Sequence, residues 1–141
     1  MLLKNALKDK LTKEELDLVP KAFDQVGSIA IFSEFPEGLS KKERIIGNTL
    51  IEINKPIKTV VKKVSKHSGI FRTKKVKIIA GKRSKITEHK ESGVRVRLNI
   101  DTCYFSPRLS SERLRIAKLV KKGESVLVLF SGVGIYPFII A

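Results

Sequence analysis

The sequence predicts an α+β fold, in which a mixed sheet with packed helices is followed by the first helix and strand of a truncated open α/β (Rossmann-like) fold. Three observations predict it. The first half holds two helix-opening patterns, strand-like runs follow between residues 59 and 100, and the last third has the pattern loop, helix, apolar run and glycine turn. We place the boundary in the loop at 105–110, which separates residues 1–108 from residues 109–141.

A short helix and a strand are predicted in the first 33 residues. Thr12 and Glu15 have the spacing of a capping box, in which each side chain bonds the backbone N–H of the other residue. Pro20 ends the segment that follows, so residues 13–19 are predicted as a helix. Residues 23–33 have the composition of one strand with an early glycine.

A second capping box, Ser40 with Glu43, opens a longer helix that Pro56 ends. Its apolar residues fall on one face, which we expect to pack on the sheet: Ile46, Leu50 and Ile53. Three later runs predict strands, at residues 59–61, 76–80 and 94–100. The last run alternates strictly, which predicts a half-buried strand with Arg95 and Arg97 on its exposed side.

The charge of the chain predicts a polyanionic partner. Lys and Arg number 29 against 14 Asp and Glu, for a net charge of +15, and fifteen of the basic residues but only two acids lie between residues 55 and 97. An acidic membrane surface or protein would respond to the same field. A surface of ion pairs typical of thermophiles would intersperse acids, so RNA contact is favoured, mainly to the backbone because aromatic residues are few. The candidate RNA-binding residues are Lys74, Lys75, Arg83, Arg95, Arg97 and Arg108.

Cysteine and histidine usage excludes several classes of protein. Cys103 is the only cysteine, so an intramolecular disulfide is excluded, and the two histidines have no spacing typical of a zinc site, so no metal is predicted. The N-terminus lacks the apolar region of a signal peptide, and the most apolar segment, 126–141, is broken by Ser131, Pro137 and two glycines. We therefore expect a cytoplasmic protein without a membrane partner.

The last third of the chain predicts a helix and a buried strand. Ser110 or Ser111 can cap the helix, Glu112 lies in its first turn where the helix dipole favours an acid, and residues 121–123, Lys-Lys-Gly, have the pattern of its end. Residues 126–130 are an apolar run bounded by turn residues, which is typical of a strand buried on both faces of a parallel sheet.

The glycine turn that follows this predicted strand is a candidate ligand site. In open α/β sheets, a nucleotide-like ligand approaches the end of a strand where glycines allow close contact. Gly132 and Gly134 fit that pattern, but Phe138 replaces the third glycine of the dinucleotide fingerprint, so S-adenosylmethionine fits at least as well as a dinucleotide. A Gly-x-Gly that only turns the chain is the commoner case.

Five segments together resemble a known enzyme family: residues 69–72, 80–83, 88–93, 104–113 and 128–134. In this order and spacing they are similar to the archaeal tRNA (guanine-37-N1)-methyltransferases, and Tyr136-Pro137 after the glycine turn resembles the subgroup that is also linked to wyosine modification. The resemblance covers roughly residues 18–141. It implies the start of a class I methyltransferase fold, S-adenosylmethionine as the cofactor and tRNA as the partner.

The resemblance also implies roles for individual residues. Methylating N1 of guanine requires a base, and Glu112 matches the family's proposed base. Arg72 matches the arginine that stabilises negative charge on the guanine O6, and Tyr104 matches a position near the target base. The residues that match the S-adenosylmethionine pocket are Arg113, Phe130, Gly132, Val133 and Gly134.

Other interpretations of three of these residues stay open. Glu112 has the position of an ordinary acid at a helix N-terminus. Tyr104 equally suits the edge of a core, with its hydroxyl facing outward. Arg108 can hold a backbone phosphate or tie its own loop down.

The chain departs from the family pattern in ways that limit the expected activity. Val128 stands where many methyltransferases have an acid, and the family's tRNA-elbow domain, the ribose-binding acid and the Asn-Pro-type motif are absent. We therefore expect a catalytically incomplete chain, either a truncated product or one half of a split enzyme whose remainder lies on a second chain. The unpaired strand 126–130 would then favour association. The alternatives are a non-catalytic tRNA-binding subunit and a related wyosine-pathway aminocarboxypropyl transferase.

Overall fold

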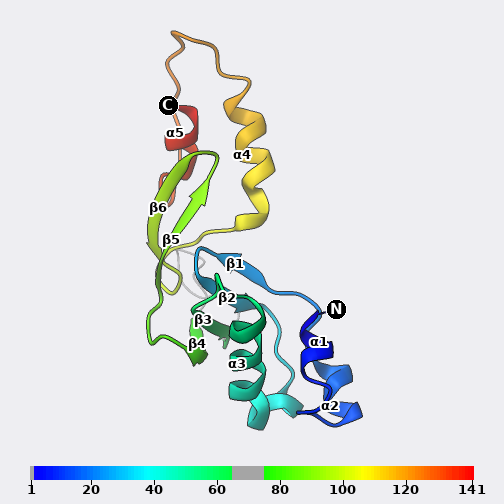
Figure 1. Ribbon diagram of the computed structural model, residues 1–141. Helices are drawn as coiled ribbons and strands as arrows, with labels where there is room; N and C mark the ends of the chain where they lie inside the picture. Colours follow the sequence, from blue (N-terminus) through cyan, green and yellow to red (C-terminus); the bar gives the residue numbers. More distant parts are fainter. Residues whose placement is uncertain (1, 65–74) are drawn as a thin grey trace.

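The computed structural model describes residues 2–64 and 75–141, which form an elongated molecule of two lobes (Figure 1). The sheet lobe, residues 2–64 and 75–84, contains helices α1 (Leu2–Ala6), α2 (Lys13–Leu18), η1 (Glu37–Lys42) and α3 (Glu43–Ile53), and strands β1 (Asp24–Val26), β2 (Ile29–Phe32), β3 (Thr59–Lys63) and β4 (Val76–Gly81). The hairpin lobe, residues 85–141, contains β5 (Ile86–Glu91), β6 (Val94–Asn99), η2 (Pro107–Leu109), α4 (Ser110–Ala117) and α5 (Ile135–Ile140). No helix in these ranges is long and apolar enough to cross a membrane.

The four strands of the sheet lobe form one mixed sheet in the order β1-β2-β3-β4. β2 runs parallel to β3, whereas β1 and β4 are antiparallel to their neighbours. A parallel pair needs a long crossover connection, and α3 supplies it by lying across one face of the sheet (Figure 1). The predicted mixed sheet with packed helices is therefore confirmed.

Strand β2 is buried along its whole length because both faces of the sheet are covered. Ala30 and Phe32 belong to the hydrophobic cluster on the helix side, while Ile29 and Ile31 belong to the cluster on the other side. The hairpin lobe covers this second face with Val96, Leu98 and Ile135. Burial on both faces explains why β2 is uniformly apolar.

The two predictions for the first 33 residues have different outcomes. The capping box is confirmed, because the Thr12 hydroxyl accepts a hydrogen bond from the Glu15 N–H at 3.2 Å and the Glu15 carboxylate accepts one from the Thr12 N–H at 2.9 Å. The single strand at 23–33 is wrong. The chain turns at Gly27, whose φ of 55° suits glycine, and returns as the hairpin β1–β2.

Helix α3 is confirmed, but its predicted capping box is wrong. Ile46 and Leu50 are buried in the core on the sheet, and the helix ends before Pro56 as expected. Ser40 lies inside η1, where its hydroxyl donates to the carbonyl three residues back. Lys42 is the N-cap residue and makes no side-chain cap bond.

The Glu43 carboxylate joins α3 to the sheet instead of capping the helix. It lies 2.5 Å from the Lys62 ammonium on β3 and 2.8 Å from the Lys77 ammonium on β4. Burial alone would raise the pKa of Glu43, but the two lysines outweigh it and hold that pKa below its ordinary value. The carboxylate is therefore ionised at neutral pH.

The strands predicted at 59–61, 76–80 and 94–100 are confirmed, with ends that differ by one residue in β4 and β6 and by two in β3. On β6, Arg95 and Arg97 are exposed and Val96 is buried, as the alternation predicts. Strand β5 was not predicted. It pairs with β6 through a tight turn at Ser92 and Gly93, both with positive φ.

Two predictions for the last third need correction. Helix α4 begins at Ser110 without a side-chain cap and ends at Ala117, well before the Lys-Lys-Gly signature at 121–123. Residues 126–130 are not a strand, because the described part of the chain offers no strand beside them to accept their hydrogen bonds. Leu127 and Phe130 are consequently 83% and 102% exposed. After the glycine turn the chain forms α5, a helix that was not predicted.

The β1–β2 turn forms one joint between the lobes. Gly27 N–H donates to His89 Nδ1 at 3.2 Å, and Ser28 N–H donates to the Thr87 hydroxyl at 3.0 Å. A Cβ atom on Gly27 would lie 2.1 Å from the Glu88 carbonyl oxygen. Only glycine therefore allows the turn to lie this close to β5.

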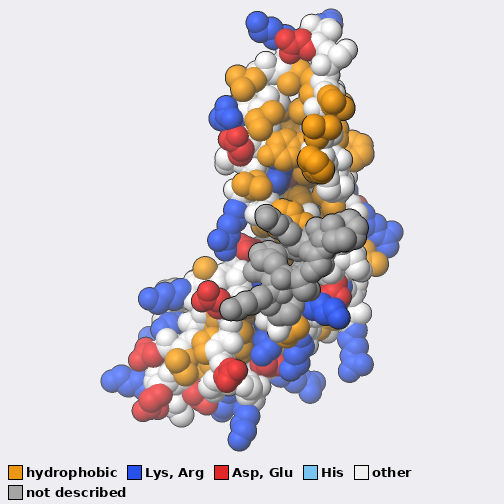
Figure 2. Space-filling view, turned by 180° about the vertical axis from the view of Figure 1, so that it is seen from behind, with side chains coloured by type: hydrophobic (Ala, Val, Ile, Leu, Met, Phe, Trp, Pro, Cys, Tyr) orange, Lys and Arg blue, Asp and Glu red, His pale blue; other side chains and the backbone are white. Residues whose placement is uncertain are grey.

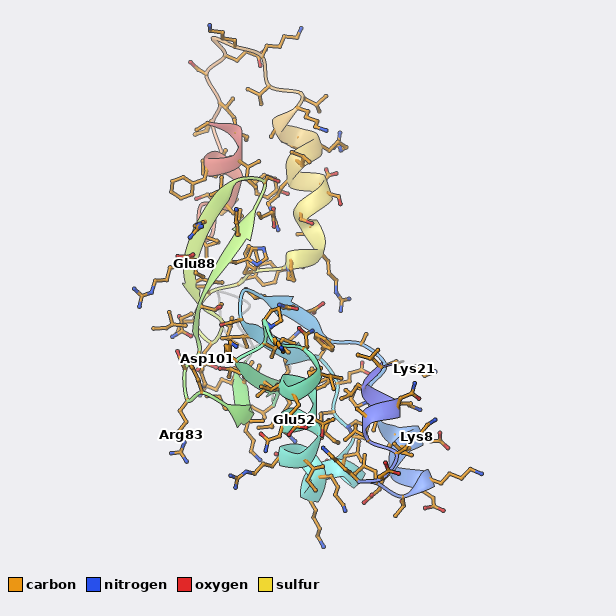
Figure 3. The ribbon with its side chains drawn as sticks, in the orientation of Figure 1. Lys8, Lys21, Glu52, Arg83, Glu88 and Asp101 are labelled. Atoms are coloured by element: carbon orange, nitrogen blue, oxygen red, sulfur yellow. The ribbon has the colours of Figure 1, made fainter. Side chains whose placement is uncertain are left out.

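Asp101 forms a second joint after β6. Its carboxylate accepts hydrogen bonds from the Val76 N–H at 2.9 Å and from the Lys85 ammonium at 2.8 Å. Figure 3 shows Glu88, Asp101 and Arg83 following one another along one edge of the molecule. The two joints together fix the hairpin against the sheet lobe.

Candidate functional site

A pocket of about 340 Å³ lies where the two lobes meet. Residues of all four strands of the sheet line it together with residues between 100 and 108, and its charged side chains are Asp24, Lys63 and Arg108. Small-ligand pockets begin at about 300 Å³, so the volume suits one small group such as a single ring system. The pocket therefore combines apolar side chains such as Val26 and Ile31 with charges of both signs.

Tyr104 and Arg108, two of the predicted site residues, line this pocket. Tyr104 is 56% exposed, so its ring is available to a ligand. Arg108 Nε donates to the Asp24 carboxylate at 2.7 Å and thereby ties its loop to β1, while its side chain stays 68% exposed. Arg108 thus has the loop-holding role and remains accessible to an anion.

Glu112 lies in the first turn of α4, as predicted, and is paired along the helix. Arg115 Nε and Nη2 donate to its two carboxylate oxygens at 2.8 and 2.7 Å. This fork lowers the pKa of Glu112, and the Arg115 and Glu112 side chains are 60% and 44% exposed. The carboxylate is ionised and near the surface, outside the residues that line the pocket.

Arg113 is buried, in contrast to its neighbour Glu112. Its Nε and Nη2 atoms donate to the Glu91 carboxylate at 2.6 and 2.7 Å, and Nη2 also donates to the Ser106 carbonyl at 3.0 Å. Its guanidinium lies 5.1 Å from the centre of the Phe105 ring. These contacts give Arg113 a supporting role at the centre of the hairpin lobe.

The predicted cofactor turn lies on the outside of the hairpin lobe. Gly132 and Gly134 have φ values of 57° and 78°, and Gly134 precedes α5. Among the described residues, a Cβ atom on Gly132 would have only the Tyr104 carbonyl oxygen near it, at 3.9 Å. The turn thus lies beside the Tyr104 backbone, with Val133 partly buried and Phe130 fully exposed.

The candidate RNA-binding residues spread over both lobes. Lys75, Arg83 and Arg97 are exposed, and Arg95 is exposed while pairing with Glu88 at 3.2 Å. Arg72 and Lys74 lie outside the described residues.

Two family models match the chain. One, the TYW2 N-terminal domain, matches residues 3–84, and the other, the TRM5/TYW2 methyltransferase domain, matches residues 87–141. The chain belongs to the TRM5/TYW2 family. The family resemblance inferred from the sequence is thereby confirmed.

Two relatives in the TRM5/TYW2 family show the extent of the match. Trm5b of Pyrococcus abyssi, a tRNA (guanine(37)-N(1))-methyltransferase, is 41% identical over 123 residues, which are 87% of this chain and 37% of that protein. Taw22 of Nanoarchaeum equitans, a tRNA (guanine(37)-N(1))/4-demethylwyosine(37)-methyltransferase, is 36% identical over 85% of this chain and 39% of that protein. The chain thus spans less than two fifths of their length.

Solved structures of TRM5 proteins share the fold. The crystal structure of Pyrococcus abyssi Trm5b superposes with a TM-score of 0.82 at 38% identity, over 92% of this chain and 39% of that one. Trm5 of Methanocaldococcus jannaschii in complex with adenosine superposes with a TM-score of 0.77 at 30% identity, over 98% of this chain and 40% of that one. The aTrm5 chain in its complex with tRNALeu superposes with a TM-score of 0.73 at 33% identity, over 84% of this chain and 36% of that one.

Sequence reasoning missed the polar residues that organise this TRM5/TYW2 site. Asp24 binds Arg108, His89 binds the β1–β2 turn, and Glu91 binds Arg113. None of the three was predicted as a site residue. Residues 88–93 belong to one of the five segments that resemble the family. Periodicity predicts which apolar residues are buried, but it does not indicate that an acid such as Glu91 is buried. The one signal in the sequence was that Glu91 lies in a segment that resembles the family, 22 residues before Arg113 in another such segment.

Proposed function

We propose that the chain is the N-terminal part of a tRNA (guanine-37-N1)-methyltransferase, which transfers a methyl group from S-adenosylmethionine to N1 of guanosine-37 beside the anticodon. The observation that carries this proposal is the likeness to Pyrococcus abyssi Trm5b, with a TM-score of 0.82 over 92% of the chain. The net charge of +15 and the likeness to a TRM5 protein solved with tRNA support tRNA as the partner.

Glu112 is the proposed general base. Removing the N1 proton of guanine needs a positioned carboxylate, since the ring nitrogen does not ionise at neutral pH. The two hydrogen bonds from Arg115 keep Glu112 ionised. Because water competes with this solvent-exposed pair, the carboxylate can turn toward the guanine. Arg72 is proposed to stabilise the charge that develops on O6.

The pocket between the lobes is proposed to receive the target base. An enzyme that modifies a ring atom must turn the base out of its stack, and an aromatic side chain then stacks on it. Tyr104 offers its ring at this pocket, and the basic groups of Lys63 and Arg108 favour the adjoining phosphates. The exposed residues Lys75, Arg83, Arg95 and Arg97 extend this basic surface over both lobes.

The glycine turn is proposed to hold S-adenosylmethionine, which supplies the methyl group when bound. Gly132 and Gly134 both have left-handed φ values, and the backbone at Gly132 is open to a ligand, so this turn fits the cofactor, with Phe130 and Val133 beside it. At Gly134 the Phe138 ring lies 3.3 Å from where a Cβ atom would be. Arg113 fits less directly, because Glu91 and Ser106 already occupy its guanidinium. We propose that Arg113 supports the cofactor turn from beneath.

The remainder of the methyltransferase domain is proposed to complete this site, either on a second chain or in a longer protein. Residues 126–130 are apolar and exposed, with Leu127 and Phe130 the most open. An added strand would supply the missing backbone hydrogen bonds and cover these side chains. We propose that this segment then becomes the first strand of a Rossmann-like sheet, so that residues 109–141 form the start of the catalytic domain.

The test is methyl transfer from labelled S-adenosylmethionine to unmodified tRNA. This chain is assayed alone and with a polypeptide that carries the rest of the methyltransferase domain. We expect activity only in the mixture and its loss in Glu112→Gln, whereas Glu14→Gln, a matched change of an exposed acid on α2, stays active. A mixture that binds tRNA tightly without methylating it would overturn the proposal in favour of a non-catalytic tRNA-binding subunit.

A second candidate function lies in wyosine modification of the same nucleotide. It is favoured by the match of residues 3–84 to the TYW2 N-terminal domain and by the likeness to Taw22. Its reactions would use the same donor, either for a methyl group or for an aminocarboxypropyl group. Mass spectrometry of residue 37 after reaction distinguishes the products, because the two groups differ in mass.

A further inference from the structure

A continuous line of polar contacts crosses the boundary between the lobes. It runs from the Gly27 N–H to His89 Nδ1 at 3.2 Å, from His89 Nε2 to the Glu91 carboxylate at 3.4 Å, and from that carboxylate to Arg113. Arg113 then donates to the Ser106 carbonyl at 3.0 Å. The line joins the β1–β2 turn, strand β5, helix α4 and the loop that carries Tyr104.

The contacts of His89 select one tautomer. Because Nδ1 accepts the Gly27 N–H, the proton of the neutral ring lies on Nε2, which faces the Glu91 carboxylate. The ring also packs against Phe105, with 4.9 Å between ring centres. Only 14% of the His89 side chain is exposed, so water does not replace these partners freely.

The contacts of Glu91 and Arg113 are equally specific. The two side chains are 6% and 3% exposed and meet in a fork of two hydrogen bonds. Tyr136 of α5 lies 5.9 Å from the guanidinium, so the last helix rests on the same group. A glutamine at position 91 would turn an N–H group toward one donor of the arginine, which breaks the fork.

We propose that His89 and Glu91 are positioning residues, which hold Arg113, the Tyr104 loop and the start of α4 in one arrangement relative to the sheet lobe. The reaction that they serve rests on the proposed function. Ser106 lies two residues after Tyr104, and Glu112 precedes Arg113 on α4. The line thus sets the distance between the sheet that carries Lys63 and the two side chains proposed to act on the base.

The first experiment uses the chain alone, as wild type, Glu91→Gln and His89→Asn, with Glu88→Gln as the matched control. Nitrogen-15 NMR reports the His89 tautomer, and hydrogen exchange reports the amides of residues 109–117, from Leu109, which donates to the Ser106 carbonyl, through α4. In Glu91→Gln we expect the Nε2-protonated tautomer to remain, because the Gly27 N–H still donates to Nδ1, and exchange at 109–117 at least about tenfold faster, with α3 unchanged. His89→Asn keeps an acceptor for Gly27 and loses the contact to Glu91, so a smaller increase in the same segment is expected. Glu88→Gln removes only the exposed pair with Arg95 and should change neither signal.

The second experiment repeats the methylation assay in the mixture. Misplacing a reacting group by about 1 Å costs on the order of a hundredfold, so kcat should fall at least about tenfold in Glu91→Gln while the KM for tRNA stays within about twofold. Unchanged exchange at 109–117, or a change in KM alone, would overturn the proposal. Faster exchange in Glu91→Gln, together with a wild-type mixture that never methylates tRNA, would refute the proposed function and leave the coupling of the lobes intact.

Discussion

The two lobes of the molecule differ in how completely they bury their apolar residues. In the sheet lobe, residues such as Leu7, Phe32 and Ile57 are fully buried between the sheet and its helices. In the hairpin lobe, large apolar side chains remain exposed: Leu119, Leu127, Leu129, Phe130 and Phe138. Figure 2 shows hydrophobic side chains gathered on the upper part of the molecule, while charged groups are interspersed over the lower part.

This difference shows that the lobes rely on different interactions. The sheet lobe is stabilised by its own hydrophobic core and by the ion pair that joins Glu43 of α3 to Lys62 of β3. The hairpin lobe uses the outer face of that sheet and a buried Glu91–Arg113 pair, and it keeps an apolar surface available. Such a surface matches the proposal that the rest of a methyltransferase domain packs there.

The largest expected effect is in the hairpin lobe. Arg113→Ala leaves the Glu91 carboxylate buried without its partner, which should lower the free energy of unfolding by about 3–5 kcal/mol. Hydrogen exchange should show β5 and β6 losing protection before β2 and α3. Arg115→Ala, which removes an exposed partner two residues along the same helix, is the control and should leave exchange unchanged. Equal effects of the two variants would contradict a special role for the buried pair.

In the sheet lobe, the largest expected effect comes from Leu50→Ala. Leu50 is 2% exposed on the face of α3 toward the sheet. A cavity there should lower the free energy of unfolding, measured in urea, by about 2–5 kcal/mol. Ile45→Ala on the same helix removes a side chain that is 38% exposed and should cost much less. Similar losses would mean that α3 does not pack as described.

Acid should weaken the sheet lobe through Glu43. Its lowered pKa means that folding favours the ionised form, so this stabilisation is complete above the ordinary pKa of 4.5 and is lost as the pH falls through the lower native pKa. Glu43→Gln should be less stable at pH 7 and should show a flatter decline in acid. Thermal unfolding between pH 7 and pH 2 checks this, and parallel curves for the two proteins would argue against it.

The smallest expected effect on stability comes from Phe130→Ser. This fully exposed ring packs on little else, so the free energy of unfolding should change by less than about 0.5 kcal/mol. Self-association by sedimentation velocity should nevertheless decrease, because the apolar surface shrinks. Leu2→Ser, in the sheet lobe and also exposed, is the control; an equal decrease there would remove the distinction between the lobes.

Local patterns in the sequence predicted the elements whose residues carry their own signal. The Thr12 capping box, the apolar face of α3 and the alternation of β6 each depend on neighbours a few residues apart. The same local reasoning failed at Ser40 and at residues 126–130. The Ser40 pattern lies inside a turn of η1, and the apolar run needs adjacent strands before it can form one.

The sequence by itself determined the basic charge, the mixed α+β class, the order of most elements and the family, because these follow from composition, short-range periodicity and motif order. Only the tertiary structure decided that residues 23–33 turn back at Gly27, that Glu91 meets Arg113, and that Arg108 meets Asp24. These contacts join residues that lie 22 or 84 positions apart, or depend on a close approach to β5. No local pattern encodes them, since each partner becomes buried or paired only after the two lobes have packed together.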